Sequence, residues 1–192
     1  MHQAESCPAD VSPRKQRSRM KGILVVKAHR CLACHSCEMA CSVEHSKSKD
    51  LFEAVNESPG PAARVSVSRG EDFVVPLQCR QCENAPCVAV CPTNALYCAD
   101  QESPVVIDHD RCIGCKWCIL ACPFGVITLD ERARTIVKCD QCFERLERGE
   151  LPACVTACPT GALEFKTLEE VLAEKRGAYL VEIQRAVGGD EK

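Results

Sequence analysis

Cysteine is the residue type in this 192-residue chain that could do the most chemistry, and the chain contains 18 cysteines. Sixteen fall into four groups of four: Cys31, Cys34, Cys37 and Cys41; Cys79, Cys82, Cys87 and Cys91; Cys112, Cys115, Cys118 and Cys122; and Cys139, Cys142, Cys154 and Cys158. The first and third groups have the spacing C-x2-C-x2-C-x3-C, and the last three groups end in Cys-Pro. Thiols this dense form disulfides or bind metal centres, and their spacing discriminates between the two.

The spacing favours iron–sulfur clusters over disulfides and zinc. A disulfide framework requires a secreted chain, and we expect no secretory signal because the N-terminal residues contain no apolar run. Three cysteines within seven residues also converge on one point, whereas disulfides need separated pairs. Structural zinc typically takes two C-x2-C pairs. The run C-x2-C-x2-C-x3-C-P is the bacterial ferredoxin ligand pattern, so we predict four [4Fe–4S] clusters.

The ligand sets follow from a property of that pattern, in which the fourth cysteine of a run binds the other cluster of the pair. The second and third groups are neighbours and pair with each other, which leaves the two outer groups as the second pair. The predicted sets are Cys79, Cys82, Cys87 and Cys122; Cys112, Cys115, Cys118 and Cys91; Cys31, Cys34, Cys37 and Cys158; and Cys139, Cys142, Cys154 and Cys41. Because the outer sets need both chain ends, we expect cluster insertion and folding to be coupled.

Short apolar segments flank the cysteine groups and predict small strands. We expect strands at residues 22–28, 64–68, 73–77, 105–108, 126–129, 135–138 and 162–165, of which the second and third form a hairpin. Each C-x3-C segment suits a helix start, where backbone N–H groups can point at an anionic cluster. Residues 45–63 read as a surface loop. Thr167 and Glu170 form a capping box that predicts a helix to about residue 175, before Gly177.

Together these elements predict an α+β fold of two nested bacterial two-[4Fe-4S] ferredoxin-like modules. The outer module comprises residues 22–78 and 124–165, and residues 79–123 form the inner module inserted in it. Residues 1–21 are expected to be a disordered basic extension, and residues 166–192 a helical tail. The hydrophobic fraction of 46% includes the cysteines, and aromatic residues reach only 4%. We therefore expect the clusters to fill much of the interior.

Other residues near the cysteines are candidates for tuning the clusters. Trp117 is predicted to shield its cluster from water, with packing or partner contact as the alternative, and His35 to tune a potential through its N–H group. We expect Cys7 and Cys98 to be plain thiols, because no ligand position remains open. We expect His45 and His109 to be solvated. We expect Ile113, Ile119 and Val126 to form apolar walls around the inner pair of clusters.

The sequence resembles the four-cluster ferredoxin family of electron-transfer subunits. This family includes iron–sulfur subunits of carbon monoxide dehydrogenase, hydrogenase and formate dehydrogenase, dimethyl sulfoxide reductase, and tungsten aldehyde oxidoreductase or benzoyl-coenzyme A reductase complexes. The resemblance rests on four segments: "CLACHSCEMAC" at 31–41, "CRQCENAPCVAVCPTNAL" at 79–96, "RCIGCKWCILACPFGVI" at 111–127 and "KCDQCFERLERGELPACVTACPTGAL" at 138–163. It implies a catalytic oxidoreductase partner of the molybdenum, tungsten or nickel–iron type, and leaves room for a further redox subunit.

The function expected is an electron wire between the partner's active site and an external donor or acceptor. The chain has no nucleophile–base pair, phosphate loop or dinucleotide fingerprint, so we expect no catalysis by the chain itself. Its formal charge of −3 becomes about −11 if each cluster with its thiolates contributes about −2. A free soluble polyferredoxin is the alternative. A sensor whose basic residues 11–30 contact nucleic acid lacks a recognition helix, so we expect no nucleic-acid partner.

We expect the protein in the cytoplasm, or in a complex at the cytoplasmic face of the membrane, because low-potential clusters need reducing conditions. The longest apolar runs are only a few residues, so no direct membrane span is expected.

Overall fold

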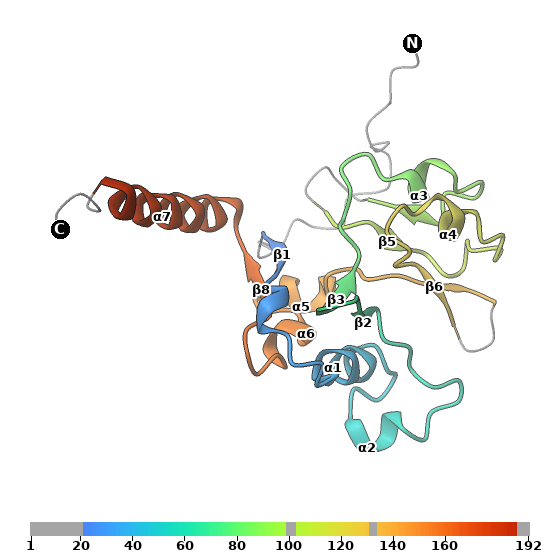
Figure 1. Cartoon of the computed structure of the whole chain (residues 1–192). Coiled ribbons are helices and arrows are strands. Elements are labelled where there is room, and N and C mark those ends of the chain that lie inside the picture. Colours follow the sequence, from blue (N-terminus) through green and yellow to red (C-terminus); the bar gives the residue numbers. More distant parts are fainter. Residues whose placement is uncertain (1–20, 99–102, 131–133, 188–192) are drawn as a thin grey trace, which may run out of the picture.

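Small two-stranded sheets, joined by short helices, make up the computed structural model, which describes residues 21–98, 103–130 and 134–187 (Figure 1). The strands are β1 (Ile23–Val26), β2 (Val65–Arg69), β3 (Val74–Gln78), β4 (Leu96–Tyr97), β5 (Val106–Ile107), β6 (Thr128–Leu129), β7 (Ile136–Val137) and β8 (Leu163–Lys166). They pair antiparallel as β1–β8, β2–β3, β4–β5 and β6–β7. The mixture of helices and short strands agrees with the α+β class predicted.

Helices begin at the cysteine groups, as the C-x3-C spacing predicts. The helices are α1 (Ser36–Glu44), α2 (Leu51–Ala54), α3 (Pro86–Ala89), α4 (Trp117–Ala121), α5 (Phe143–Glu147), α6 (Ala153–Thr156) and α7 (Leu168–Val187), with a 3-10 turn, η1 (Ala28–Arg30). The third cysteine of every group is the second residue of a helix: Cys37 in α1, Cys87 in α3, Cys118 in α4 and Cys154 in α6. These sulfurs therefore sit where helix N–H groups have no intrahelical acceptor.

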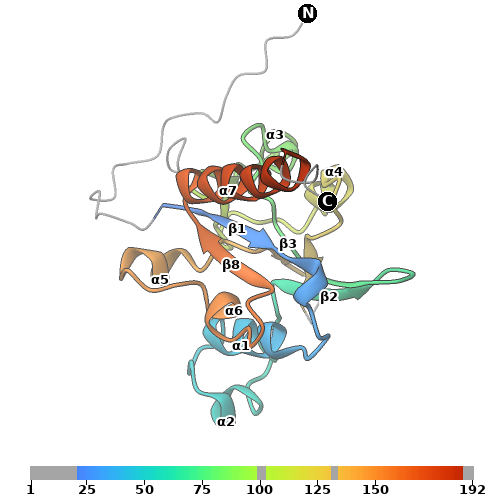
Figure 2. The same cartoon turned by 60° about the vertical axis from the view of Figure 1, so that its left-hand side comes forward.

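The β1–β8 sheet joins the two ends of the described chain. Ile23 lies opposite Lys166 and Val26 opposite Leu163, and α1 and α6 pack beneath the sheet (Figure 2). The Lys27 ammonium lies 2.8 Å from a carboxylate oxygen of Glu164 on the partner strand. Residues from both chain ends consequently share a buried core, which comprises Cys37, Cys41, Val65, Cys154 and Leu163.

A second core lies in the middle of the sequence and is separate from the first. It consists of buried Ala85, Cys87, Leu96, Val105, Cys118, Ile127 and Ile136. Both cores include cysteines, so some of the sulfur atoms belong to the packed interior of the protein. Each predicted strand is present within the described residues, and β4 is a short additional strand that pairs with β5.

Two helices and one helix end depart from the sequence-based expectation. The expected loop at 45–63 contains α2, which Asp50 caps by accepting hydrogen bonds from two backbone amides. Helix α5 lies between the second and third cysteines of the last group and was not predicted. The prediction that the last helix ends before Gly177 was wrong, since α7 continues to Val187. One glycine costs only about 1 kcal/mol in a helix, which is too little to end it among good helix formers.

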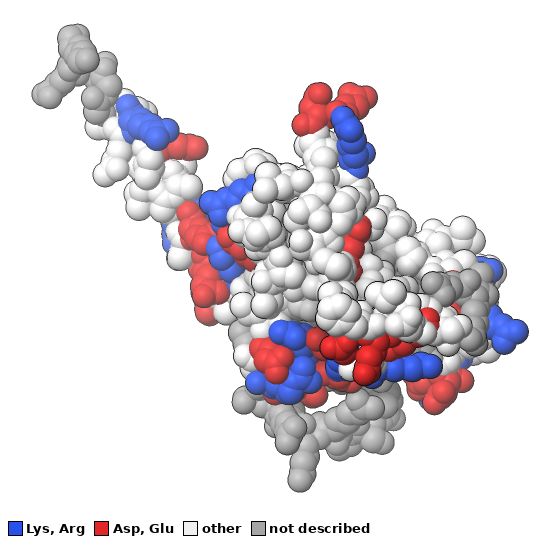
Figure 3. Space-filling model, turned by 90° about the horizontal axis from the view of Figure 1, so that it is seen from below, with Lys and Arg blue, Asp and Glu red and all other residues white. Residues whose placement is uncertain are grey.

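Helix α7 extends away from the β1–β8 sheet as a narrow arm (Figures 1 and 3). The predicted capping box is present, because Thr167 N donates to Glu170 and Glu170 N donates to the Thr167 hydroxyl. Apart from half-buried Val171, every residue of the helix is exposed, apolar ones included. Acidic and basic side chains lie side by side on the face of the molecule in Figure 3. Among the described residues, no helix combines the length and apolar character needed to cross a membrane.

The first residues of β8 and of α7 are both leucines, Leu163 and Leu168, and they provide a matched test of the outer core. Leu163 is 2% exposed and Leu168 is 64% exposed. We expect Leu163→Ala to lower the free energy of unfolding by about 2–5 kcal/mol, because it leaves a cavity. Leu168→Ala should change it by no more than about 0.5 kcal/mol. Urea unfolding of the anaerobic protein, followed by circular dichroism, measures both; equal losses would contradict the proposed importance of this core.

Candidate iron–sulfur sites

Each cysteine group contains a loop with left-handed backbone. The residues with positive φ are Ala33 and His35 in the first group, Gln81 in the second, Gly114 and Lys116 in the third, and Gln141, Cys142 and Gly149 in the fourth. Non-glycine residues rarely adopt this conformation, so its recurrence marks a shape that the loops share. The tight curl lets successive cysteines of one loop face a common point.

The middle of the chain contains two cavities lined by cysteine. One has about 320 Å³ of empty space, adjoining solvent included, and its cysteines are Cys91, Cys112, Cys115 and Cys118. The other has about 330 Å³ by the same measure, and its cysteines are Cys79, Cys82, Cys87 and Cys122. Each cavity therefore takes three cysteines from one group and the fourth from the other. This is the exchange that the spacing predicts for the inner pair.

A third set of thiols, Cys41, Cys139, Cys142 and Cys154, is buried throughout. Burial raises the pKa of Cys139 and of Cys142 to about 12, and the nearby Cys41 adds to the rise in both. Burial also raises the pKa of Cys154 strongly, with Cys139, Cys142 and Cys41 contributing. The four sulfurs thus lie within electrostatic range of one another. Such thiols become anions only if cations join them, and this fits a thiolate-bound metal cluster.

The remaining predicted set is more open. Cys37 is buried, Cys31 and Cys158 are half-buried and Cys34 is exposed. Hydrogen bonds with Ser36 lower the pKa of the Cys34 thiol, and the nearby Cys158 opposes this effect. Cys34 and Cys158, which are far apart in sequence, are therefore near each other in space.

Backbone amides point at several of the sulfurs. Ala95 N donates to Cys91 Sγ and Ala162 N to Cys158 Sγ, both at 3.2 Å. The hydroxyls of Thr93 and Thr160 lie 3.8 Å from the same two sulfurs. Donors of this kind stabilise negative charge on sulfur. Sequence reasoning missed them, although the repeated Cys-Pro-Thr-x-Ala-Leu at 91–96 and 158–163 is a visible signal.

A buried lysine, also missed, connects the inner and outer regions. Lys138 Nζ donates to the carbonyl oxygens of Val105 at 2.6 Å and Cys139 at 2.9 Å, and lies 3.3 Å from Gln81 Oε1. The same side chain lines the cavity that contains Cys87, and its positive charge acts to lower the pKa of Cys87, although burial raises that pKa overall. Lys138 therefore places a positive charge where an anionic cluster would be held.

Comparison with known proteins shows the family of the chain. A family model described as "4Fe-4S dicluster domain" matches residues 71–168. An iron-sulfur protein of Rhodospirillum rubrum is 40% identical, over 85% of this chain and 92% of its own length. The thiosulfate reductase electron transfer subunit PhsB of Salmonella typhi is 39% identical, over 84% of this chain and 79% of its own. The electron transport protein HydN of Escherichia coli K12 is 37% identical, over 82% of this chain and 96% of its own length.

The chain belongs to the 4Fe-4S ferredoxin-type family of electron-transfer subunits.

In this ferredoxin-type protein, the apolar residues predicted to surround the inner pair of clusters lie at or near the two cavities. Ile113 lines the first cavity and Val126 the second, while Ile119 packs against the inner core. Trp117 is the first residue of α4, is 62% exposed, and is not among the residues that line the first cavity. Its shielding role stays a prediction.

Two histidines of the first cysteine group differ in environment. His35 is exposed, and its Nδ1 lies 2.7 Å from Glu38 Oε2; its tuning role stays a prediction. The expectation that His45 is solvated was wrong, because its side chain is only 12% exposed and contacts Asp140 across 95 residues of sequence. His109 is exposed, as expected.

The two spare cysteines also differ. Cys98 is buried and disulfide-bonded, so the prediction that it is a plain thiol was wrong. Sequence spacing cannot reveal which thiol lies beside another in space. Cys7 lies outside the described residues.

Two glycines of this ferredoxin-type protein test how tightly the loop of the third group is built. Gly114 and Gly125 both have positive φ, but an added Cβ would overlap the Arg134 carbonyl only at Gly114 and would meet open space at Gly125. We expect Gly125→Ala to cost about 1 kcal/mol, from backbone strain alone. Gly114→Ala should cost clearly more and release iron on dilution. Iron retention and urea unfolding measure the difference, and equal behaviour of the two variants would contradict it.

Proposed function

We propose that the chain is a non-catalytic electron-transfer subunit with four [4Fe–4S] clusters. It connects the active site of a molybdenum, tungsten or nickel–iron oxidoreductase with an external electron donor or acceptor. The observation that carries the proposal is the pair of cavities whose lining cysteines exchange the fourth member between groups. Each cluster, when bound, takes up and gives out one electron at a time.

The proposed ligands are the sixteen cysteines in the four sets predicted from the spacing. The cavity linings support the two inner sets, the mutual effects on pKa support the set with Cys41, and the proximity of Cys34 and Cys158 supports the last. We further propose that the sets form nested modules, with residues 79–123 inserted between 22–78 and 124–165. The β1–β8 pairing and the two separate cores support this arrangement. Residues 1–21 are proposed as an extension and 166–192 as a tail.

The protein's own residues have three tasks in this function. The two cores keep water away from the thiol groups that they include. Amide N–H groups at Cys91 and Cys158 offset negative charge on sulfur. Lys138 adds a positive charge between the inner and outer regions, where repulsion between two anionic centres would otherwise be strong.

The names of the relatives support a catalytic partner. They include electron-transfer or other subunits of three enzymes: thiosulfate reductase, tetrathionate reductase from Salmonella typhimurium and sulfite dehydrogenase from Allochromatium vinosum. Two other relatives, HydN and YsaA, are named only as electron transport proteins, which favours a freely diffusing polyferredoxin as the second candidate. For either function we propose the cytoplasm, or a complex at the cytoplasmic face of the membrane, because reduced clusters need reducing surroundings.

The cluster number is tested by metal analysis of anaerobically purified protein. Four clusters require about sixteen iron and sixteen sulfide per chain. Replacing Cys87 by Ala should remove about four of each, whereas Cys82→Ser leaves an oxygen ligand in place and should remove fewer. A wild-type content near eight iron would contradict the four-cluster proposal.

The partner is tested by tagging the chain and purifying it anaerobically from its native cells. A subunit should elute with a larger oxidoreductase in fixed proportion, and native mass spectrometry should give the mass of the complex. Elution of the chain alone, fully loaded with iron and able to reduce several enzymes, would favour the diffusing polyferredoxin.

A further inference from the structure

The first cysteine group differs from the others in how its helix ends. Cys41 precedes Ser42, whereas the fourth cysteine of every other group precedes proline. Proline disfavours helical backbone in the residue before it, and α3, α4 and α6 end before their fourth cysteine. Helix α1 instead continues through Cys41 to Glu44. This extension places His45, four residues after Cys41, one helical turn further along the same face.

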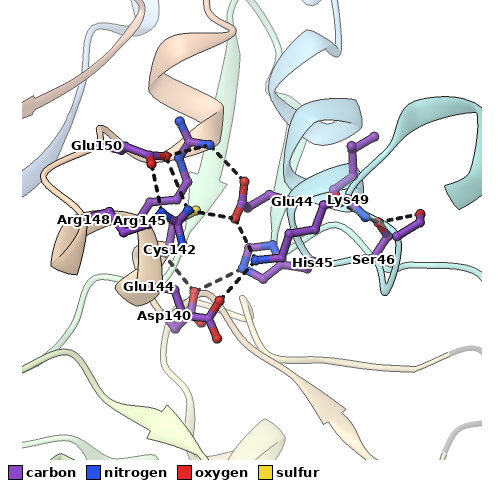
Figure 4. A network of polar contacts seen from close by, with 12 residues as sticks. Glu44, His45, Ser46, Lys49, Asp140, Cys142, Glu144, Arg145, Arg148 and Glu150 are labelled. Atoms are coloured by element: carbon purple, nitrogen blue, oxygen red, sulfur yellow. Dashed lines mark hydrogen bonds and ion pairs between the residues drawn. The ribbon is translucent and has the colours of Figure 1, made fainter.

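His45 makes contacts with both of its ring nitrogens. Nδ1 lies 2.7 Å from the Cys41 carbonyl oxygen and 3.6 Å from Cys41 Sγ. Nε2 lies 3.3 Å from Asp140 Oδ1 (Figure 4). Carbonyl and carboxylate oxygens only accept hydrogen bonds, so both nitrogens donate and the ring is an imidazolium cation.

Two further groups complete a polar bridge, which we define as His45, Asp140 and Arg64. Arg64 Nη1 lies 2.6 Å from Asp140 Oδ2, and Arg64 N donates to Cys41 Sγ at 3.2 Å. Asp140 Oδ1 also accepts from the backbone N–H of Cys142 at 3.0 Å. Two cations and one anion thus lie against the Cys41 and Cys142 loops, and two N–H groups point at one sulfur.

This bridge stands beside the most buried of the four thiol sets. Cys41, Cys139, Cys142 and Cys154 are all buried, whereas each other set includes half-buried or exposed members. Distance from water makes an additional negative charge unfavourable, which lowers the reduction potential of a cluster. A nearby cation and N–H donors to sulfur act in the opposite direction. The net positive bridge therefore compensates for the burial of this site.

We propose that His45 is a positioning residue that raises the reduction potential of the cluster held by Cys41, Cys139, Cys142 and Cys154. The inference rests on the proposed function, because it takes that cluster as given. One-electron reduction adds one negative charge to the site, and the His45 N–H group at the Cys41 sulfur stabilises it. The other three sites lack this contribution from His45, so one potential of four depends on the residue.

The test is a redox titration of the anaerobic, iron-loaded protein, followed by electron paramagnetic resonance. We expect His45→Leu to shift one of four midpoint potentials to more negative values and to leave the other three unchanged. Asp140→Asn, which removes the negative charge of the bridge and keeps its shape, should shift the same potential in the opposite direction. His45→Asn, which keeps a nitrogen donor near the Nδ1 position, should shift it less than His45→Leu. The matched control, His29→Leu, alters an exposed histidine outside the bridge and should leave the potential of this cluster unchanged.

Several results would overturn the proposal. These are unchanged potentials in His45→Leu, equal shifts in all four, or shifts of the same sign in His45→Leu and Asp140→Asn, which indicate a packing role. If His45→Leu loses iron, the other two variants carry the test. Loss of one cluster in all three variants would assign the bridge to assembly and also overturn the proposal. Iron analysis of the wild-type protein separates these results from failure of the four-cluster function, which would appear as missing iron before any substitution.

Discussion

The convergence of four sulfur atoms on each proposed site is the constraint on which the rest of this structure depends. Thiolates repel one another, and a buried one is unfavourable even alone, as the raised pKa values of Cys139 and Cys142 reveal. Such a site is stable only when metal cations balance the charge. Metal binding and folding then become one process, because the ligands come from segments that meet only in the folded chain.

This constraint accounts for the small amount of regular structure. Sheets of two strands and helices that, apart from α7, have fewer than three turns make few contacts of their own, and the two cores are correspondingly small. Cysteines contribute to both cores, so bound clusters join the packing directly. The elements serve mainly to fix the loops with left-handed backbone and the helix starts that follow them. The low aromatic content, which would be a weakness in another fold, is compatible with this arrangement.

The features predictable from sequence are those set by local spacing. Three thiols within seven residues, such as Cys31 to Cys37, are held together by covalent geometry, and the exchange of the fourth cysteine follows from the ferredoxin pattern. The flanking strands were visible as short apolar runs. His45 and Lys138 could not be placed this way, because the residues that bury them come from distant segments: Asp140 for His45, and Val105 for Lys138. The end of α7 is likewise not set by Gly177, because one unfavourable residue does not outweigh the helical residues on both sides of it.

The pairing of β1 with β8 has a consequence for the order in which the protein is made. Lys27 and its partner Glu164 are 137 residues apart, so the first strand leaves the ribosome long before the strand that pairs with it. At a synthesis rate of about 5–20 residues per second, this delay is roughly 7 to 30 s. For most of that interval the thiols of residues 31–41 are present without the cysteines of 139–158. The first thiols of the nascent chain must therefore escape oxidation before the chain can bind any redox partner.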